Sequence, residues 1–96
     1  MNNYLVIDGT LNGTGLRDYY EGGYIDPLEL NLSPELVTLH KSWLLKYWDA
    51  FYTGYSDSNL VEALDAEGMK IAQLIQKELG VKVCYYSDAN QQRIPI

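Results

Sequence analysis

Short apolar runs near both ends of the chain predict two β-strands. Residues 4–7 are continuously apolar, which is typical of a central strand that is covered on at least one face. Residues 81–86 alternate instead, so that Val81, Val83 and Tyr85 would face one way and the residues between them the other. The chain therefore contributes at least two strands to a sheet.

Residues 28–32 also alternate between apolar and polar side chains, and Pro27 stands in front of them. They are a candidate third strand, and the proline suits an edge position because it has no N–H to donate. Two arrangements stay open at this point. If residues 28–32 cross the domain as a strand, the last strand runs parallel to the first. If residues 9–32 remain at one end, the two strands run antiparallel.

Two amphipathic helices are predicted between the strands, because apolar residues recur there at spacings of three and four. The first covers about residues 34–53 and begins after Ser33, a favourable N-cap. The second covers about residues 60–79 and ends at Gly80. Gly68 in its middle costs about 1 kcal/mol relative to alanine, which indicates a close crossing with a neighbouring element.

These elements predict one α+β domain over residues 1–96, a small two- to three-stranded sheet packed on an antiparallel helical hairpin. The tail, residues 90–96, is polar and then apolar, and it either frays or adds an edge strand to a partner. No apolar run is long enough to span a membrane, and the N-terminus lacks a signal-peptide pattern. We therefore expect a cytoplasmic protein that does not contact a membrane.

Residues 9–32 depart furthest from the composition of a hydrophobic core. Together with Asp8 they hold five of the eight glycines, three of the nine tyrosines and five of the thirteen acidic residues. A long segment that is rich in glycine, tyrosine and acid is usually a binding surface or a loosely ordered loop. The segment is therefore the first candidate for function.

The net charge of −6 is unevenly distributed, since residues 1–40 hold six acidic residues against Arg17 alone. Such a field repels nucleic acid and attracts basic surfaces. Ordinary surface acidity that keeps the protein in solution is the alternative explanation. We expect no nucleic-acid binding and favour a basic protein partner.

The patterns that carry catalysis or metal binding are incomplete in this chain. Residues 6–11 resemble the D-x-D-G-T-L motif of the haloacid dehalogenase-like phosphatases, but Val6 stands where that family has its nucleophilic aspartate. The glycine-rich stretch 9–15 lacks the Lys-Ser/Thr ending of a P-loop. His40 is the only histidine and Cys84 the only cysteine, too few for a His-based zinc site. We therefore expect no enzymatic activity, no metal and no cofactor.

The sequence favours a non-enzymatic protein-binding module whose contact residues lie between positions 18 and 29. A small, acidic chain without a catalytic set fits an inhibitor or immunity-type protein of a bacterial cell, which would cap a basic partner such as a toxin nuclease domain. The alternatives are a homodimer formed through the aromatic face of the first helix, and a small-molecule binder in which Arg17 holds an anion beside the glycine-rich loop. The expected partner-binding residues are Asp18, Tyr19, Tyr20, Glu21, Tyr24, Asp26 and Glu29.

Overall fold

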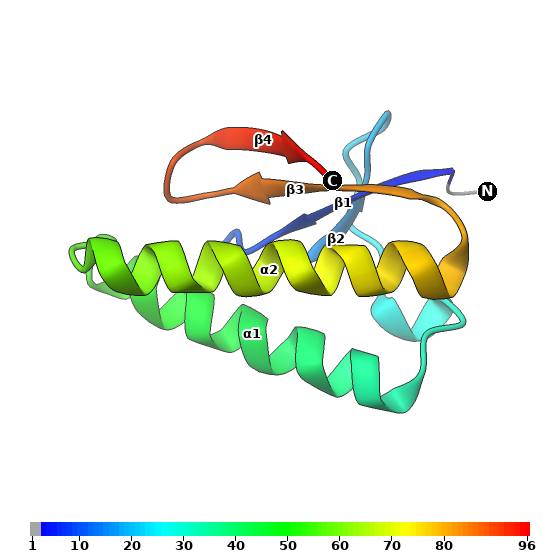
Figure 1. The fold of residues 1–96 in the computed structure, drawn as a ribbon, viewed down its shortest axis with the longest axis horizontal. Coiled ribbons are helices and arrows are strands. Elements are labelled where there is room, and N and C mark those ends of the chain that lie inside the picture. The colour runs from blue at the N-terminus through cyan, green and yellow to red at the C-terminus, as the bar shows by residue number, and fades with distance from the viewer. Residues whose placement is uncertain (1–2) are drawn as a thin grey trace.

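A computed structural model describes residues 3–96 as two layers, with two helices lying on one face of a four-stranded sheet (Figure 1). The predicted α+β class and the helical hairpin are confirmed. The sheet has four strands within the described residues, where the sequence predicted two or three. In chain order the elements are β1 (Tyr4–Asp8), β2 (Leu16–Asp18), the 3-10 helix η1 (Pro27–Glu29), α1 (Pro34–Tyr52), α2 (Ser58–Leu79), β3 (Lys82–Ser87) and β4 (Gln92–Pro95).

The strand order is β2-β1-β3-β4, and the two central strands, β1 and β3, are parallel with Val6 opposite Cys84. Both edge strands pair antiparallel with their neighbours. The candidate strand over residues 28–32 is wrong, because the chain forms η1 there and then continues without strand pairing. The first and last predicted strands, β1 and β3, are nevertheless parallel. The reason is that β2 runs back along β1 before the helices begin and so makes the crossing that residues 28–32 were expected to make.

Local capping fixes the ends of both helices. The Ser33 hydroxyl accepts a backbone N–H of the first turn of α1, as predicted. Asp57 caps α2 by accepting the N–H groups of Asn59 and Leu60, both at 3.1 Å, so this helix begins two residues earlier than predicted. Gly80 ends it in the left-handed conformation, at φ 68°. Neither helix is long and apolar enough to cross a membrane.

The core lies between the helices and the sheet, and its largest buried side chains are Trp43, Tyr47 and Tyr85. The Trp43 indole donates to the Leu64 carbonyl at 2.8 Å, which ties α1 to α2. A Cβ at Gly68 would lie 2.4 Å from the Tyr85 ring and 2.8 Å from the Trp43 ring. The close crossing predicted at Gly68 is confirmed, and α2 meets both β3 and α1 there.

The sheet face that points away from the helices is covered by side chains. Val6 and Cys84 lie on this face and are nevertheless buried. Tyrosine rings surround them, and a cation lies over each ring. The pairs are Lys82 over Tyr4 at 5.3 Å, Arg93 over Tyr19 at 4.5 Å and Arg17 over Tyr86 at 5.4 Å.

The C-terminal residues form β4 as an edge strand of the chain's own sheet. Tyr85 of β3 pairs with Ile94, and Ile94 packs against the core. The tail therefore neither frays nor waits for a partner's sheet, which corrects both interpretations of its sequence. The tail does form an edge strand, but the strand that it pairs with is β3 of the same chain.

Candidate protein-binding site

The 18–29 segment (residues 18–29) leaves the edge strand β2 and first makes a tight turn. The backbone N–H of Asp18 donates to the Gly23 carbonyl at 2.9 Å. The Asp18 carboxylate accepts the N–H groups of Tyr20 and Glu21 at 3.0 and 2.7 Å, and the residue is only 8 % exposed. Asp18 therefore holds the turn together from inside and does not present its charge to a partner.

The two adjacent tyrosines of this turn have different surroundings. Tyr19 stacks on Tyr4, with 4.0 Å between ring centroids and an angle of 11° between the planes. Tyr20 meets these two rings only edge-on and is 74 % exposed. Tyr19 thus belongs to the aromatic layer on the sheet, and Tyr20 offers its ring to solvent or to another molecule.

Tyr24 is held in one orientation by the ion pair between the half-buried Arg17 and the buried Asp8. Its hydroxyl donates to the Asp8 carboxylate at 3.1 Å, and the same carboxylate accepts Nε of Arg17 at 2.5 Å. Burial raises the pKa of Tyr24, so the hydroxyl remains a donor at neutral pH. A Cβ at Gly13 would lie within 2.8 Å of the Tyr24 ring, so the glycine allows the ring to lie on this loop.

The second half of the segment forms η1. The Asp26 carboxylate accepts the N–H of Leu28 at 3.0 Å and caps this short helix while remaining exposed. Glu29 is also exposed, and Leu28 is 78 % exposed. Between η1 and α1 lies a hollow of about 300 Å³. Its lining is mainly apolar, and the lining residues are Thr14, Asp26, Pro27, Leu28, Val37, His40, Lys41 and Leu44.

The predicted partner-binding residues fall into two exposed groups and a set that is packed beneath them. Tyr20 and Glu21 are exposed in the turn that follows β2, and residues 26–29 lie beside the start of α1 (Figure 1). Tyr24 lies between the two groups along the chain, while Asp18 and Tyr19 are packed beneath the turn. Leu28 was missed, because the alternation of residues 28–32 placed it in a strand.

The structure keeps the other side chains that could carry chemistry apart from one another. Arg17 and Asp18 are neighbours in β2 and therefore face opposite sides of the sheet, and Arg17 is paired with Asp8. His40 is buried on the helix side, whereas Cys84 lies on the other face, where burial raises the pKa of its thiol. Among residues 3–96, no three His, Cys, Asp or Glu side chains gather into a set that could hold a metal.

A buried carboxylate in the core also escaped prediction from the sequence. Asp65 of α2 accepts the hydroxyls of Tyr47 at 2.8 Å, Tyr85 at 2.6 Å and Ser87 at 2.7 Å. One aspartate beside the apolar stripe of α2 gives no signal that it points inward. The three hydrogen bonds join both helices to β3, so this cluster is a structural junction.

Comparisons with known proteins add no family to this description. No protein-family model matches the chain, and the comparisons with curated proteins and with solved structures likewise found no match. The class of molecule is therefore defined by its fold and surface, a two-layer α+β domain with an exposed, acidic and aromatic segment along one side.

Proposed function

We propose that this protein is a non-enzymatic binding module of the inhibitor or immunity type, and that its 18–29 segment caps a basic surface on a partner protein. The observation that carries the proposal is the exposure of Tyr20 and Leu28 on a segment fixed by hydrogen bonds of its own. Large exposed side chains that are already ordered lose little conformational freedom on binding, and they are typical interface anchors.

The charge around these anchors supports a basic partner. The chain has no lysine or arginine between Arg17 and Lys41, and the exposed Glu21, Asp26 and Glu29 lie within this stretch. An acidic surface of this kind speeds the encounter with a basic protein and disfavours other partners. Nuclease domains bind phosphates and are basic at their active sites, so a toxin nuclease fits this description.

The hollow beside η1 supplies a candidate anchor point for the partner. It lies next to the exposed Leu28, and its mainly apolar lining suits a side chain that the partner would bury there. An apolar contact at η1 together with acidic residues around it would resemble the usual interface, an apolar centre within a polar rim.

A pull-down with matched variants tests this proposal. The wild-type chain, the double variant Tyr20→Ala/Leu28→Ala and the control Leu45→Ala/Leu74→Ala are immobilised in equal amounts and exposed to lysate of the source cell. Leu45 and Leu74 are also exposed but lie on the helices. We expect the wild type and the control to recover one basic protein stoichiometrically, and the double variant to recover about tenfold less.

Equal recovery by all three chains would show that the 18–29 segment is not the contact surface. Recovery of the bait alone, together with a light-scattering mass of two chains, would favour the homodimer instead. Far-ultraviolet circular dichroism and urea unfolding of each variant confirm beforehand that the substitutions leave the fold intact.

A further inference from the structure

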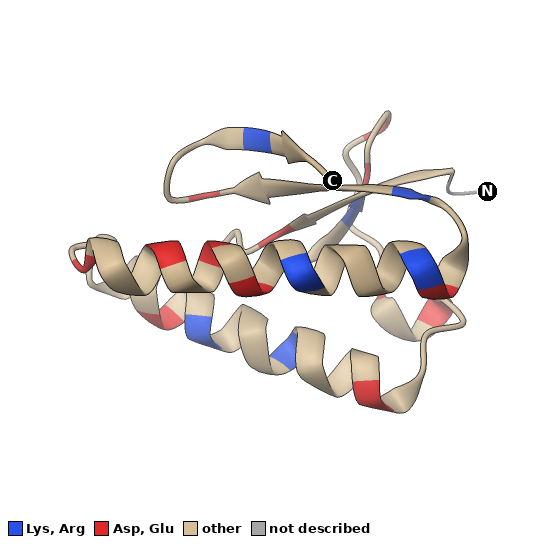
Figure 2. Cartoon of the chain, viewed as in Figure 1, with Lys and Arg blue, Asp and Glu red and all other residues tan. Residues whose placement is uncertain are grey.

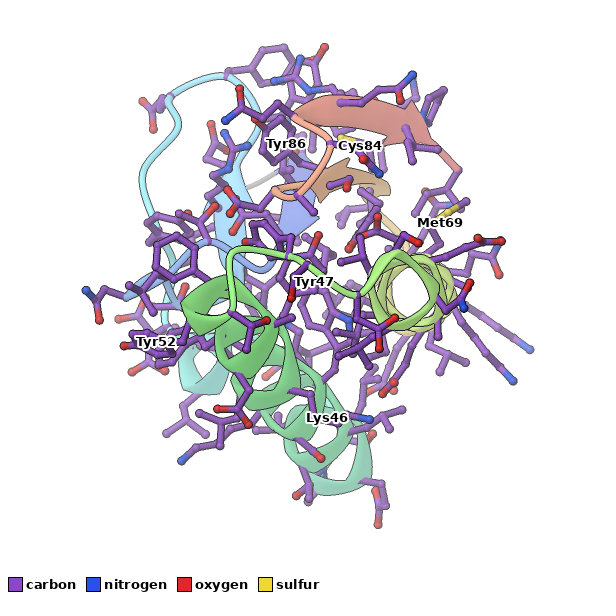
Figure 3. All side chains as sticks on the ribbon, turned by 90° about the vertical axis from the view of Figure 1, so that its left-hand side faces the viewer. Lys46, Tyr47, Tyr52, Met69, Cys84 and Tyr86 are labelled. Atoms are coloured by element: carbon purple, nitrogen blue, oxygen red, sulfur yellow. The ribbon has the colours of Figure 1, made fainter. Side chains whose placement is uncertain are left out.

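A second aromatic surface lies where α1 turns into α2, at the end of the molecule that faces the viewer in Figure 3. We call it the hairpin-tip surface and define it by the rings of Phe51, Tyr52 and Tyr55. Tyr52 is 72 % exposed and Phe51 is 39 % exposed. The Phe51 ring centroid lies 5.7 Å from that of Tyr52 and 6.0 Å from that of Tyr55, so the three rings form one continuous cluster.

The cluster is held in place by polar contacts beneath it. Tyr55 has a left-handed backbone conformation, with φ 56°, and its hydroxyl donates to Asp88 at 2.5 Å. Thr10 donates to the other oxygen of the same carboxylate at 3.1 Å, and the Tyr47 ring packs edge-on against Tyr55 at 5.7 Å. Burial raises the pKa of Tyr55, so its hydroxyl remains a donor. Tyr55 is thus fixed before any partner arrives, and the Phe51 and Tyr52 rings extend from it.

The surroundings of the hairpin-tip surface are strongly negative. Residues 47–69 contain no lysine or arginine, and α1 has no basic residue in its last turn to offset the negative end of its helix dipole. Glu67 is the only acid of this stretch that forms an ion pair within residues 3–96, with Lys46 at 2.9 Å. Figure 2 shows acidic residues at this end of both helices. The acids of the stretch are Asp49, Asp57, Glu62, Asp65 and Glu67.

A hollow of about 530 Å³ opens beside Tyr55 and extends the same electrostatic environment. Glu62 and Asp65 are among its lining residues, its walls include Val61 and Met69, and no lysine or arginine lines it. Figure 3 places Tyr52 and Met69 on opposite sides of the helix connection. A basic side chain that enters this hollow therefore meets the exposed carboxylate of Glu62.

The half-buried tyrosines of the sheet face differ from the rings of the hairpin-tip surface. Tyr4, Tyr19 and Tyr86 each have a lysine or arginine of the same chain over the ring. Within the part of the chain that the structure describes, no cation lies over Phe51 or Tyr52. Their ring faces are electron-rich and are available to a cation from another molecule.

We propose that the hairpin-tip surface binds an arginine side chain of a basic protein partner. The planar guanidinium stacks on the rings of Phe51 and Tyr52, and the neighbouring carboxylates compensate its charge. Arginine is favoured over lysine because it is more weakly hydrated and stacks on aromatic faces. This site is separate from the 18–29 segment, so the inference does not depend on the function proposed above.

A peptide titration followed by NMR tests the inference on the full chain. The probe is the capped pentapeptide Gly-Arg-Leu-Arg-Gly, and its matched control carries citrulline, which keeps the shape of arginine and removes its charge. We expect the arginine peptide to shift the amide signals of residues 48–57 in a saturable way. Tyr52→Ala should weaken this binding about threefold to tenfold. Leu74→Ala removes an exposed side chain from α2, outside both proposed surfaces, and should leave the dissociation constant unchanged.

Three results would overturn the inference. The first is the absence of shifts in residues 48–57, and the second is an equal response to the citrulline peptide. The third is a shift of the same amides with protein concentration alone, which would assign the surface to contacts between copies of this chain. Shifts confined to residues 18–29 would contradict this inference and leave the function proposed for that segment standing.

Discussion

His40 is a neutral side chain in the folded protein. It is buried, and its Nε2–H donates to the Gly15 carbonyl at 3.2 Å. Burial lowers the pKa of His40, and this effect outweighs the opposing influence of the Gly15 hydrogen bond and the Asp8 charge. The only histidine therefore reports on the core, and it also lines the hollow beside η1.

The stability of the fold should consequently depend on the pH through His40. In the unfolded chain the imidazole takes up a proton below about pH 6.5, whereas the folded protein resists protonation. The unfolded state then binds more protons, so the free energy of unfolding falls as the pH decreases from about 6.5 to 5. Urea unfolding at several pH values should show a smaller fall for His40→Gln than for the wild type. Parallel curves for the two chains would contradict this account.

The acids of the 18–29 segment show what the sequence reveals about single residues and what it conceals. Composition singled out the segment, but it treated Asp18, Glu21 and Asp26 as equal. Hydrogen bonds of the folded chain turn Asp18 inward and make Asp26 a cap, while Glu21 remains exposed. These roles depend on the turn geometry, which the order of residue types does not specify.

The crossing of α2 with β3 and α1 depends on the missing side chain at Gly68. Alanine at this position should gain about 1 kcal/mol of helix propensity. Its Cβ would however press against the rings of Tyr85 and Trp43, both of which are fixed by hydrogen bonds. Overpacking of this kind costs about 1–3 kcal/mol.

We therefore expect Gly68→Ala to lower the free energy of unfolding by up to about 2 kcal/mol, measured by urea denaturation. Gly23→Ala is the matched control, because a Cβ there has open space and the backbone does not have a positive φ. This control should change the stability by less than about 0.5 kcal/mol. A stabilised Gly68→Ala variant would show that the crossing can widen.

The helices could be predicted because capping residues and apolar spacing are local signals. The two edge strands, β2 and β4, could not be predicted. Caps and apolar spacing located α1 and α2 within two residues at each end. β2 is three residues long, too short for alternation to be visible, and β4 contains a proline. Both edge strands form because β1 and β3 offer them pairing partners, and pairing between distant segments cannot be read from either segment alone.

Acidic and basic residues occupy different parts of the molecule. Acidic residues gather along the 18–29 segment and at the hairpin tip, while Lys70 and Lys77 lie farther along α2 and Lys82 at the start of β3 (Figure 2). Two acidic and aromatic surfaces on different parts of one small domain can serve as controls for each other. Two variants with the same net charge, one altered at each surface, differ only in where the charge was changed. A difference between their association rates therefore identifies the surface that binds.

The association rate with the basic protein recovered by the wild-type chain tests the central claim most directly. Stopped-flow rates are measured over a range of salt concentrations for the wild type, Glu21→Lys/Glu29→Lys and Asp49→Lys/Glu62→Lys, two double variants that alter the net charge equally. Asp18 and Asp26 remain unchanged because they hold the segment in shape. We predict that the first variant associates about tenfold more slowly at low salt and approaches the wild-type rate at high salt, while the second stays within about twofold. Equal rates for the two double variants would contradict the assignment of binding to the 18–29 segment.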